Sequence, residues 1–281
     1  MARVRFLHIP KCAGISFQDC LKRVYGGQCF SFSGDLQRDL DRYHRLGYSG
    51  LAGITVFTGH SPRITGVTEI DALTTVTLLR RPVDRVLSFC QHVSEGKSPH
   101  LVERFPPDTF DLTAFLECGD RELSNFQTKT LLGDETFDLP QDEESTLARR
   151  AARVLEKEID CFGIVEEFER SLVLFRHMLG WNRWPVYRTL NARNRSKPMA
   201  FDEDHVRRIR ELNRVDLQVY ENAVSLFHRR ISGMPGSLNA RVAILRGVQV
   251  GAQATRLFAS GGDALKRLPR RCIKRVMRLA R

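Results

Sequence analysis

The sequence predicts an α/β fold with a mainly parallel central sheet flanked by helices. Three short runs rich in aliphatic and β-branched residues, 3–9, 53–60 and 74–80, have the length and composition of buried strands. The first and third runs are each followed by a segment with apolar residues at helical spacing. Strands that alternate with helices in this way are typical of a parallel sheet covered by helices.

The first half of the chain supports this order element by element. After the strand at 3–9, residues 15–25 predict a helix whose apolar stripe contains Ile15, Cys20, Leu21 and Val24. After the strand at 74–80, Pro82 suits the first turn of a helix, because the N–H group that proline lacks has no intrahelical partner there.

The second half repeats the alternation. Residues 143–159 are amphipathic and predict a helix, 160–168 predict a further buried strand, and 169–180 predict a helix that ends at Gly180. Residues 202–231 predict one long helix, with acidic residues at its start and arginines at its end, as the helix dipole favours.

The positive charge of the chain is concentrated at its end. The net charge is +11, but eight basic residues and no acid lie in residues 264–281, which leaves +3 for the preceding chain. We therefore expect a mildly basic domain at 1–235, as suits the binding of small anions, and a basic amphipathic extension at 236–281. The extension suits the surface of an anionic membrane, and a solvated, disordered tail is an open alternative.

The cysteines and the apolar pattern set further expectations. The seven cysteines are scattered and form no CxxC pair, which argues against a disulfide framework and against a structural zinc site. The N-terminus has no signal-peptide pattern, and no run approaches the roughly 18 apolar residues of a membrane span. We therefore expect a cytoplasmic protein with reduced thiols and no bound metal, at most peripheral to a membrane.

A candidate anion-binding loop follows the first strand. In "FLHIPKCAGISF", residues 6–17, the strand ends at a proline, and Lys11 precedes a turn of small residues and Ser16. The N–H groups and dipole of a helix N-terminus favour anions at such a loop. The motif is not a Walker A loop, in which the lysine comes after the glycines. A tight turn with a solvated lysine is the alternative.

A second candidate anion site lies in "TLLRRPVDRVLSF", residues 77–89. Arg80 would stand at the carboxyl end of a strand, and Ser88 two turns into the following helix, where it shares a face with Arg85. A guanidinium group matches phosphate oxygens in pairs. Surface charge at a helix start is the alternative.

Together these motifs resemble those of the carbohydrate sulfotransferases, and in particular the 2-O-sulfotransferase-like branch. The first is similar to the family's 5′-phosphosulfate loop and the second to its 3′-phosphate motif. Three weaker similarities follow, at 125–133, 162–175 and 213–227. The resemblance covers about residues 4–230 and implies a P-loop-like sulfotransferase fold. It also implies 3′-phosphoadenosine 5′-phosphosulfate (PAPS) as donor.

The resemblance implies a role for each matching residue. Lys11 would contact the oxygen that bridges phosphate and sulfate, and Arg80 and Ser88 would hold the 3′-phosphate. The residues that would wrap the 5′-phosphate are Ala13, Gly14, Ile15, Ser16 and Phe17. Two departures stand out: the family usually has threonine and two glycines where this chain has Cys12, Ala13 and Gly14, and an acid where it has Arg81.

Sulfuryl transfer to a hydroxyl needs a base, and His60 is the candidate. It follows the strand at 53–60 and would lie at the same edge of the sheet as Lys11. A histidine at this point is the base in the similar family branch. His8, His92 and Asp19 are the other candidates, of which His8 is expected to be structural.

A polar, arginine-rich segment at 187–198 precedes the long helix. Asn191, Arg195 and Ser196 could bind the adenine end of the donor or an anionic acceptor, and a solvated connection is equally compatible with this composition.

These expectations favour a metal-independent sulfotransferase acting on a carbohydrate or glycolipid hydroxyl. A nucleotide-dependent kinase would need a GK[ST] sequence and an aspartate at a strand end. A non-catalytic polyanion- or nucleic-acid-binding protein would interleave aromatic and basic residues, and the tail has no aromatic residue after Phe258.

Overall fold

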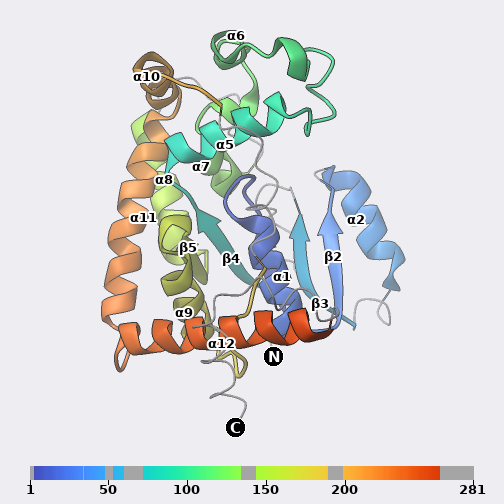
Figure 1. Ribbon diagram of the computed structural model, residues 1–281, viewed down its shortest axis with the longest axis vertical. Helices are drawn as coiled ribbons and strands as arrows, with labels where there is room; N and C mark the ends of the chain where they lie inside the picture. Colours follow the sequence, from blue (N-terminus) through green and yellow to red (C-terminus); the bar gives the residue numbers. More distant parts are fainter. Residues whose placement is uncertain are drawn as a thin grey trace.

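The computed structural model confirms the α/β class. It describes residues 3–33, 35–47, 53–59, 72–133, 144–188 and 199–259. A sheet of five strands in the order β2-β3-β1-β4-β5 forms its centre, every adjacent pair is parallel, and helices flank it (Figure 1). The strands are β1 (Val4–Leu7), β2 (Gln28–Phe32), β3 (Ile54–Gly59), β4 (Thr74–Leu79) and β5 (Cys161–Ile164).

The helices connect and cover these strands. Those before residue 140 are α1 (Gly14–Tyr25), α2 (Leu36–Arg45), α5 (Pro82–Ser94), α6 (Leu112–Leu116) and α7 (Phe126–Leu132), with short 3-10 turns η1 (Pro107–Thr109) and η2 (Arg121–Leu123). Those after it are α8 (Glu144–Lys157), the 3-10 turn η5 (Val165–Glu167), α9 (Phe168–Met178), α10 (Glu203–Leu212), α11 (Arg214–Ser232) and α12 (Leu238–Ala259). No helix among the described residues is both long and apolar enough to span a bilayer.

The central strand β1 carries the candidate anion-binding loop. It pairs with β3 through Val4 and Val56, and with β4 through Phe6 and Val76. Because the strands are parallel, the segments that follow β1, β3 and β4 leave the sheet at one edge. Ligands of open α/β sheets bind at this carboxyl edge.

The faces of the sheet are buried under helices whose apolar stripes meet it. Phe6, Phe17 and Phe175, from β1, α1 and α9, are at most 2% exposed. The Phe17 ring lies edge-to-face with Phe6 and tilted against Phe175, with ring centroids 4.8 Å apart in each pair. On the other side of the core, α8 packs on α11, and α11 packs against β5. Of the stripe predicted for α1, Cys20, Leu21 and Val24 are buried as expected, whereas Ile15 is 49% exposed.

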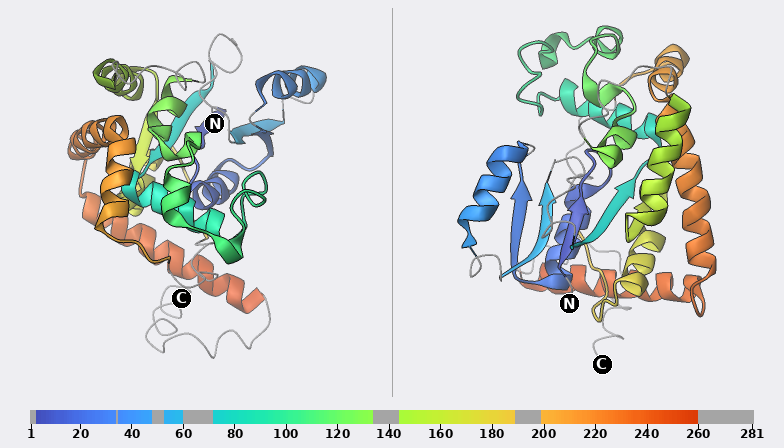
Figure 2. Two further views of the ribbon diagram at one scale, coloured as in Figure 1. Left: turned by 90° about the horizontal axis from the view of Figure 1, so that it is seen from above. Right: turned by 180° about the vertical axis from the view of Figure 1, so that it is seen from behind.

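A cap of short helices stands over the carboxyl edge. Figures 1 and 2 show α5, α6, α7 and α10 at this end of the molecule and α12 crossing the opposite end. The cap has its own apolar cluster, in which Phe89, Phe115 and Ile209 are at most 2% exposed. Ile209 comes from α10, so the cap joins segments that are far apart in the sequence.

The structure corrects two predicted boundaries. The single helix expected at 202–231 is wrong: α10 and α11 are separate, because the backbone of Asn213 leaves the helical region (φ −124°, ψ 32°). The buried side-chain amide of Asn213 donates to the carbonyl groups of Leu123 and Ile209, at 2.7 and 2.9 Å. The strand expected at 160–168 ends at Ile164, where η5 begins.

Strand β2 and helix α2 are among the elements that the sequence did not predict, as are α6, α7 and α12. Strand β2 forms one edge of the sheet and alternates in burial, and α2 follows it. Phe30 and Phe32 of β2 pack with Tyr43 of α2 and with Phe57 of β3 in a small cluster of their own. With only one buried face and five residues, β2 gives a weak sequence signal.

The boundary predicted after residue 235 stays a prediction. The helix that follows it, α12, packs against α9 and contributes Val242 and Leu245 to the main core. Its Gln249 pairs with the backbone of Tyr187 at both the N–H and the carbonyl group, at 3.1 and 2.5 Å. Residues 260–281, which contain the basic tail, lie outside the described residues.

The N-termini of α7 and α11 cap each other. Asp216, in the first turn of α11, accepts hydrogen bonds from the N–H groups of Gln127 and Thr128 and from the Thr128 hydroxyl, at 3.1, 2.7 and 2.6 Å. In return, the Asn125 side chain accepts from the N–H groups of Val215 and Asp216, at 3.0 and 3.1 Å. Each side chain satisfies donors that a helix start leaves without intrahelical partners.

We predict that Asp216→Ala lowers the free energy of unfolding by about 3 kcal/mol or more, because it leaves buried donors of α7 without an acceptor. Urea unfolding followed by circular dichroism measures the change. The control is Asp204→Ala, which removes an exposed ion pair with Arg207 in the first turn of α10 and should cost less than about 1 kcal/mol. Equal losses in the two variants would contradict the capping role.

Candidate functional site

The loop after β1 has an unusual backbone that suits anion binding. Lys11 and Ala13 both have positive φ, 67° and 56°, although neither is glycine. Ala13 is the residue before α1, and no side chain among the described residues caps that helix. The N–H groups of Gly14, Ile15 and Ser16, which begin α1, therefore remain available to a ligand. Left-handed residues in such a turn direct successive backbone N–H groups toward one point, which forms an anion-binding concavity.

Close packing under the loop explains Gly14. A Cβ atom at this position would lie 1.7 Å from Nε2 of His8, which is buried beneath the loop. The Gln18 side chain lies 3.3 Å from Nδ1 of His8 and donates to the Thr58 hydroxyl at 2.8 Å, which ties α1 to the residue after β1 and to β3. His8 thus has the structural position expected of it.

The other predicted loop residues differ in their exposure. Ile15 is 49% exposed, and Ser16 is half-buried at the start of α1. Phe17 is fully buried, and its N–H group donates to the Ala13 carbonyl at 3.1 Å. Phe17 therefore supports the loop from the core and presents neither its ring nor its amide to a ligand.

Cys12, one of the positions at which the loop departs from the motif it resembles, lies on the inner side of the loop. Its thiol is completely buried and donates to Oε1 of Gln127 at 3.5 Å. Burial raises the pKa of this thiol to about 12, so it stays protonated at neutral pH. Cys12 is thus a contact between the loop and α7 and is not a nucleophile.

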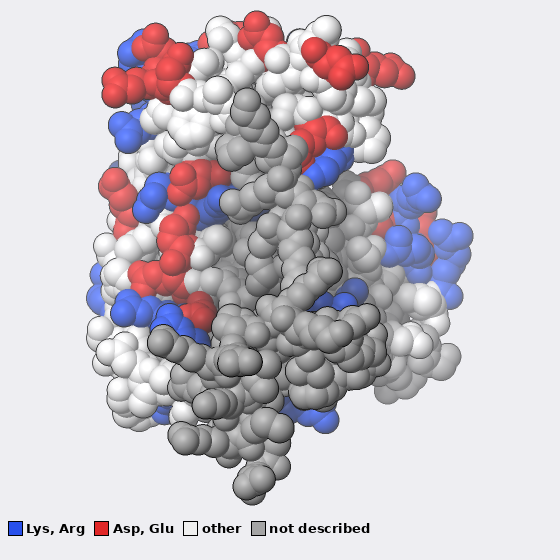
Figure 3. Space-filling model, viewed as in Figure 1, with Lys and Arg blue, Asp and Glu red and all other residues white. Residues whose placement is uncertain are grey.

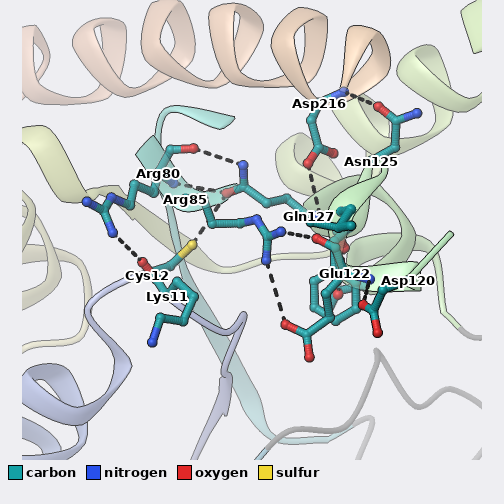
Figure 4. Close-up of polar contacts among 12 residues, drawn as sticks. Lys11, Cys12, Arg80, Arg85, Asp120, Glu122, Asn125, Gln127 and Asp216 are labelled. Carbon is teal, nitrogen blue, oxygen red and sulfur yellow. Dashed lines mark hydrogen bonds and ion pairs between the residues drawn. The ribbon is translucent and has the colours of Figure 1, made fainter. Parts of the chain in front are cut away.

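Arg80 joins the two predicted motifs. Its guanidinium group donates to the Lys11 carbonyl at 3.0 Å, so the end of β4 is bonded directly to the loop after β1 (Figure 4). The side-chain amide of Gln127 accepts from the Arg80 N–H at 3.0 Å and donates to the Arg80 carbonyl at 2.8 Å. Both backbone groups of Arg80 are therefore fixed by one side chain.

Arg85 and Ser88 do not share the environment that the sequence predicted. Ser88 is half-buried on α5, whereas Arg85 is fully buried. The Arg85 guanidinium group lies over the rings of Phe89 and Phe126, 5.8 and 5.3 Å from their centres. Arg85 is thus a core residue of the cap, and Arg80 is the arginine at the loop.

A carboxylate after β5 holds the start of α5. Oε1 of Glu166 accepts from the Arg81 N–H at 2.9 Å, and its Oε2 accepts from the Tyr220 hydroxyl at 2.7 Å. The side chain of Arg81 points outward, is 58% exposed and pairs with Asp84 at 3.3 Å. Arg81, which departs from the acid that the resemblance implies, therefore pairs through its side chain with the first turn of α5.

The Lys11 ammonium group stands in a positive environment. Burial lowers its pKa from the ordinary value to about 8; Glu122 opposes this decrease, and Arg80, Lys97 and Arg85 add to it. An anion bound beside Lys11 would relieve this electrostatic cost. The site is thus suited to a negatively charged ligand.

Strand β3 runs parallel to β1 and ends at Gly59, and His60 lies outside the described residues. Gly59, the residue before it, has φ 133°, and a Cβ atom there would lie 2.1 Å from the Phe32 carbonyl oxygen. This position therefore requires glycine.

The rival base Asp19 is already engaged. Its carboxylate accepts two hydrogen bonds from Arg23, at 2.8 and 2.9 Å, and one from the Arg188 N–H at 3.1 Å. His92 is half-buried on α5. The predicted binding residues Asn191, Arg195 and Ser196 lie outside the described residues, as His60 does.

No group of three or more His, Cys, Asp or Glu within the described ranges is placed to hold a metal ion.

Sequence analysis missed the residues that hold the site together. Gln127, Glu166 and Asp216 contact the two motifs or support their contacts. All three fall in the weaker similarities noted at 125–133, 162–175 and 213–227. Those weaker similarities were therefore the feature of the sequence that could have indicated these three residues. Only the structure shows how the three segments contact the two motifs.

Comparison with known proteins gives a consistent result. No family model matches the chain. The chain is 28% identical over 179 residues to the human protein named heparan-sulfate 6-O-sulfotransferase 1, which covers 55% of this chain and 43% of that protein. Zebrafish (Danio rerio) heparan-sulfate 6-O-sulfotransferase 1-B is 26% identical over 218 residues, covering 69% and 53%, respectively. Chicken (Gallus gallus) heparan-sulfate 6-O-sulfotransferase 2 is 25% identical over 183 residues, covering 57% and 45%.

The chain spans about half the length of the curated relatives it matches. All three are sulfotransferases of a carbohydrate by name. The resemblance to carbohydrate sulfotransferases that the two loop motifs indicate is therefore confirmed at this level.

Proposed function

We propose that the chain is a sulfotransferase that moves the sulfuryl group of PAPS to a hydroxyl of a carbohydrate, without a metal ion. The observation that carries the proposal is the direct bond between the two motifs, from the Arg80 guanidinium group to the Lys11 carbonyl at 3.0 Å. It brings two anion-binding elements together, as a donor with two separate anionic ends requires. The similarity to heparan-sulfate 6-O-sulfotransferases supports the same reaction class.

The residues present fit such a donor. The positive φ of Lys11 and Ala13 opens the loop, and Gly14 has no space for a side chain. The N–H groups at the start of α1 would hold the 5′-phosphate, and Arg80 and Ser88 would hold the 3′-phosphate. Lys11 would stabilise the negative charge that develops on the departing phosphate oxygen.

In the proposed reaction His60 takes the proton of the acceptor hydroxyl. The acceptor oxygen forms its bond to sulfur while the bond from sulfur to the phosphate oxygen breaks, and the bisphosphate leaves with that electron pair. Support for His60 comes from the position of β3, which is parallel to β1 and ends next to residue 60.

The acceptor class follows from the relatives. We propose an anionic polysaccharide related to heparan sulfate, since the similar proteins carry that substrate in their names. Those relatives are 6-O-sulfotransferases, so the 2-O-like branch indicated by the motifs stays a prediction. A glycolipid acceptor, a cytoplasmic location and a membrane contact through residues 264–281 are also predictions.

The two other functions have less support. A kinase would need a lysine after the loop, and here Lys11 comes before it. A general polyanion-binding protein would present one continuous basic surface. On the face seen in Figure 3, Lys and Arg gather over α2, and acidic residues gather over the cap near α6 and α10.

We predict that the chain binds adenosine 3′,5′-bisphosphate without magnesium, and that Arg80→Ala and Ser88→Ala each weaken this binding by about 10-fold or more, the scale of one charge-assisted hydrogen bond. Isothermal titration calorimetry in the presence of a chelator measures the affinity. Arg81→Ala is the control, because the Arg81 side chain is exposed. Wild-type affinity in both test variants would rule out the 3′-phosphate clamp.

We predict that His60→Ala lowers kcat by about 10²–10⁴-fold, the usual scale for loss of a general base, and leaves bisphosphate affinity unchanged. Asp19→Asn tests the rival base in the same assay. Full activity of the His60 variant combined with loss in the Asp19 variant would transfer the role to Asp19.

A further inference from the structure

A groove lies between α8 and α11 on the outer side of the molecule. The two helices pack on each other next to β5, at the end of the sheet opposite α2 (Figures 1 and 2). The groove has a volume of about 520 Å³ and is lined by α8 from Ser145 to Glu156 and by α11 from Gln218 to Arg229. Among the described residues, none from the loop after β1 or from the end of β4 lines it. The groove is therefore separate from the candidate donor site.

Small side chains keep the groove open. Ala148, Ala152 and Ala223 lie where the two helices face each other, and longer side chains there would fill the space. The stretch of α8 from Ser145 to Glu156 is roughly 16 Å long, at 1.5 Å per residue. A ligand made of several linked units fits this length better than a single small ion does.

Positive charge predominates along the groove. Arg149 and Arg153 stand one helical turn apart on α8, Arg229 stands on α11, and all three are exposed. Arg149 donates to the Thr146 hydroxyl at 3.3 Å. Within the described ranges none of the three arginines forms an ion pair with an acid, and the lining contains one acid, Glu156. The three guanidinium charges are thus available to an anionic ligand.

The rest of the lining favours an anionic polysaccharide. Guanidinium groups match sulfate and carboxylate oxygens in pairs. The hydroxyl and amide groups that can bind sugar hydroxyls belong to Ser145, Gln218, Asn222 and Ser225. Nucleic-acid bases would need aromatic side chains on which to stack, and none lines the groove in the described part of the chain. The basic segment 264–281 of the same chain is unsuited, because the arginines would repel it.

We propose that this groove is a second binding site for an anionic polysaccharide and holds a stretch of the acceptor chain away from the reacting hydroxyl. One end of the groove lies toward the candidate donor site, because the first turn of α11 is bonded through Asp216 to α7, whose Gln127 holds Arg80. The choice of occupant rests on the proposed function, which has such a polymer as acceptor. Binding in the groove can nevertheless be measured without donor and without transfer.

The test is the affinity for immobilised heparan sulfate, measured by surface plasmon resonance at physiological salt. The groove variant combines Arg149→Ala, Arg153→Ala and Arg229→Ala. We expect its Kd to rise by about 10-fold or more, the scale of one lost charge-assisted hydrogen bond. Circular dichroism checks that the variant is folded.

The matched control removes three exposed arginines that do not line the groove, by combining Arg150→Ala, Arg183→Ala and Arg207→Ala. It lowers the net charge of the chain by the same amount and should bind heparan sulfate nearly as the wild type does. An equal loss of affinity in the two variants would mean that overall charge alone attracts the polysaccharide, and it overturns the proposal. Wild-type affinity in the groove variant overturns it as well.

Two further arms complete the test. If the groove variant does not fold, Ser225→Glu replaces it, because this exposed position tolerates a good helix former and would place a negative charge in the groove. Heparan sulfate should then bind more weakly, and an unchanged affinity overturns the proposal. A polyglutamate peptide that displaces the wild type as effectively as a heparan sulfate oligosaccharide of equal charge also overturns it, in favour of an acidic protein segment.

Activity gives a second measurement. In the groove variant the KM for the polysaccharide should rise, while kcat and the KM for PAPS stay at their wild-type values, because the groove is separate from the donor site. An unchanged KM for the polysaccharide contradicts the proposal. If the wild type transfers no sulfate, the proposed function fails, while the heparan sulfate affinities of the two variants still decide the role of the groove.

Discussion

The arrangement of the site depends on one amide side chain, that of Gln127. It pairs with both backbone polar groups of Arg80 and accepts the hydrogen of the buried Cys12 thiol. The end of β4, the loop after β1 and the first turn of α7 therefore meet at a single group. Its own backbone N–H is held by Asp216 of α11. The bonds to Cys12 and Asp216 are buried and those to Arg80 are partly buried, so breaking one would leave a polar group poorly compensated. This constraint explains why Arg80 is placed to reach the Lys11 carbonyl.

The bond between Arg80 and the Lys11 loop brings several positive charges together, and their mutual repulsion is electrostatically unfavourable in the free protein. Lys11, Arg80 and Arg85 stand close enough that burial and their mutual repulsion bring the pKa of Lys11 to about 8. A site that is electrostatically unfavourable when free gains more from binding an anion, because the ligand removes the repulsion. The backbone at Lys11 and Ala13 also costs free energy, since left-handed conformations are unfavourable for residues other than glycine, and such strain clusters at functional sites. Both features point to one anionic ligand at the carboxyl edge of the sheet.

Sequence analysis could predict the elements with strong periodicity and the two loops with special residue types. The strands β1, β3 and β4 and the helices α1, α5 and α8 follow from apolar patterns, and Lys11 and Arg80 follow from their places at strand ends. It could not predict contacts made by ordinary polar residues in the cap. Gln127 and Asp216 look like surface residues of amphipathic helices until the helix starts are seen to face each other. Likewise, Arg85 looks solvated in "RRPVDR", and only packing between Phe89 and Phe126 shows that it is buried. The break at Asn213 was hidden because α10 and α11 continue one another's apolar pattern.

The central claim is that the loop bearing Lys11 activates a sulfuryl group for transfer. The most direct measurement is the transfer of radiolabelled sulfate from PAPS to desulfated heparan sulfate, with a chelator present, by the wild type and by Lys11→Ala. The account predicts labelled polysaccharide from the wild type. It also predicts a near-complete loss of transfer with Lys11→Ala. The circular dichroism spectrum of this variant, and its binding of adenosine 3′,5′-bisphosphate, serve as the control that it is folded. Transfer by Lys11→Ala at the wild-type rate would contradict the account.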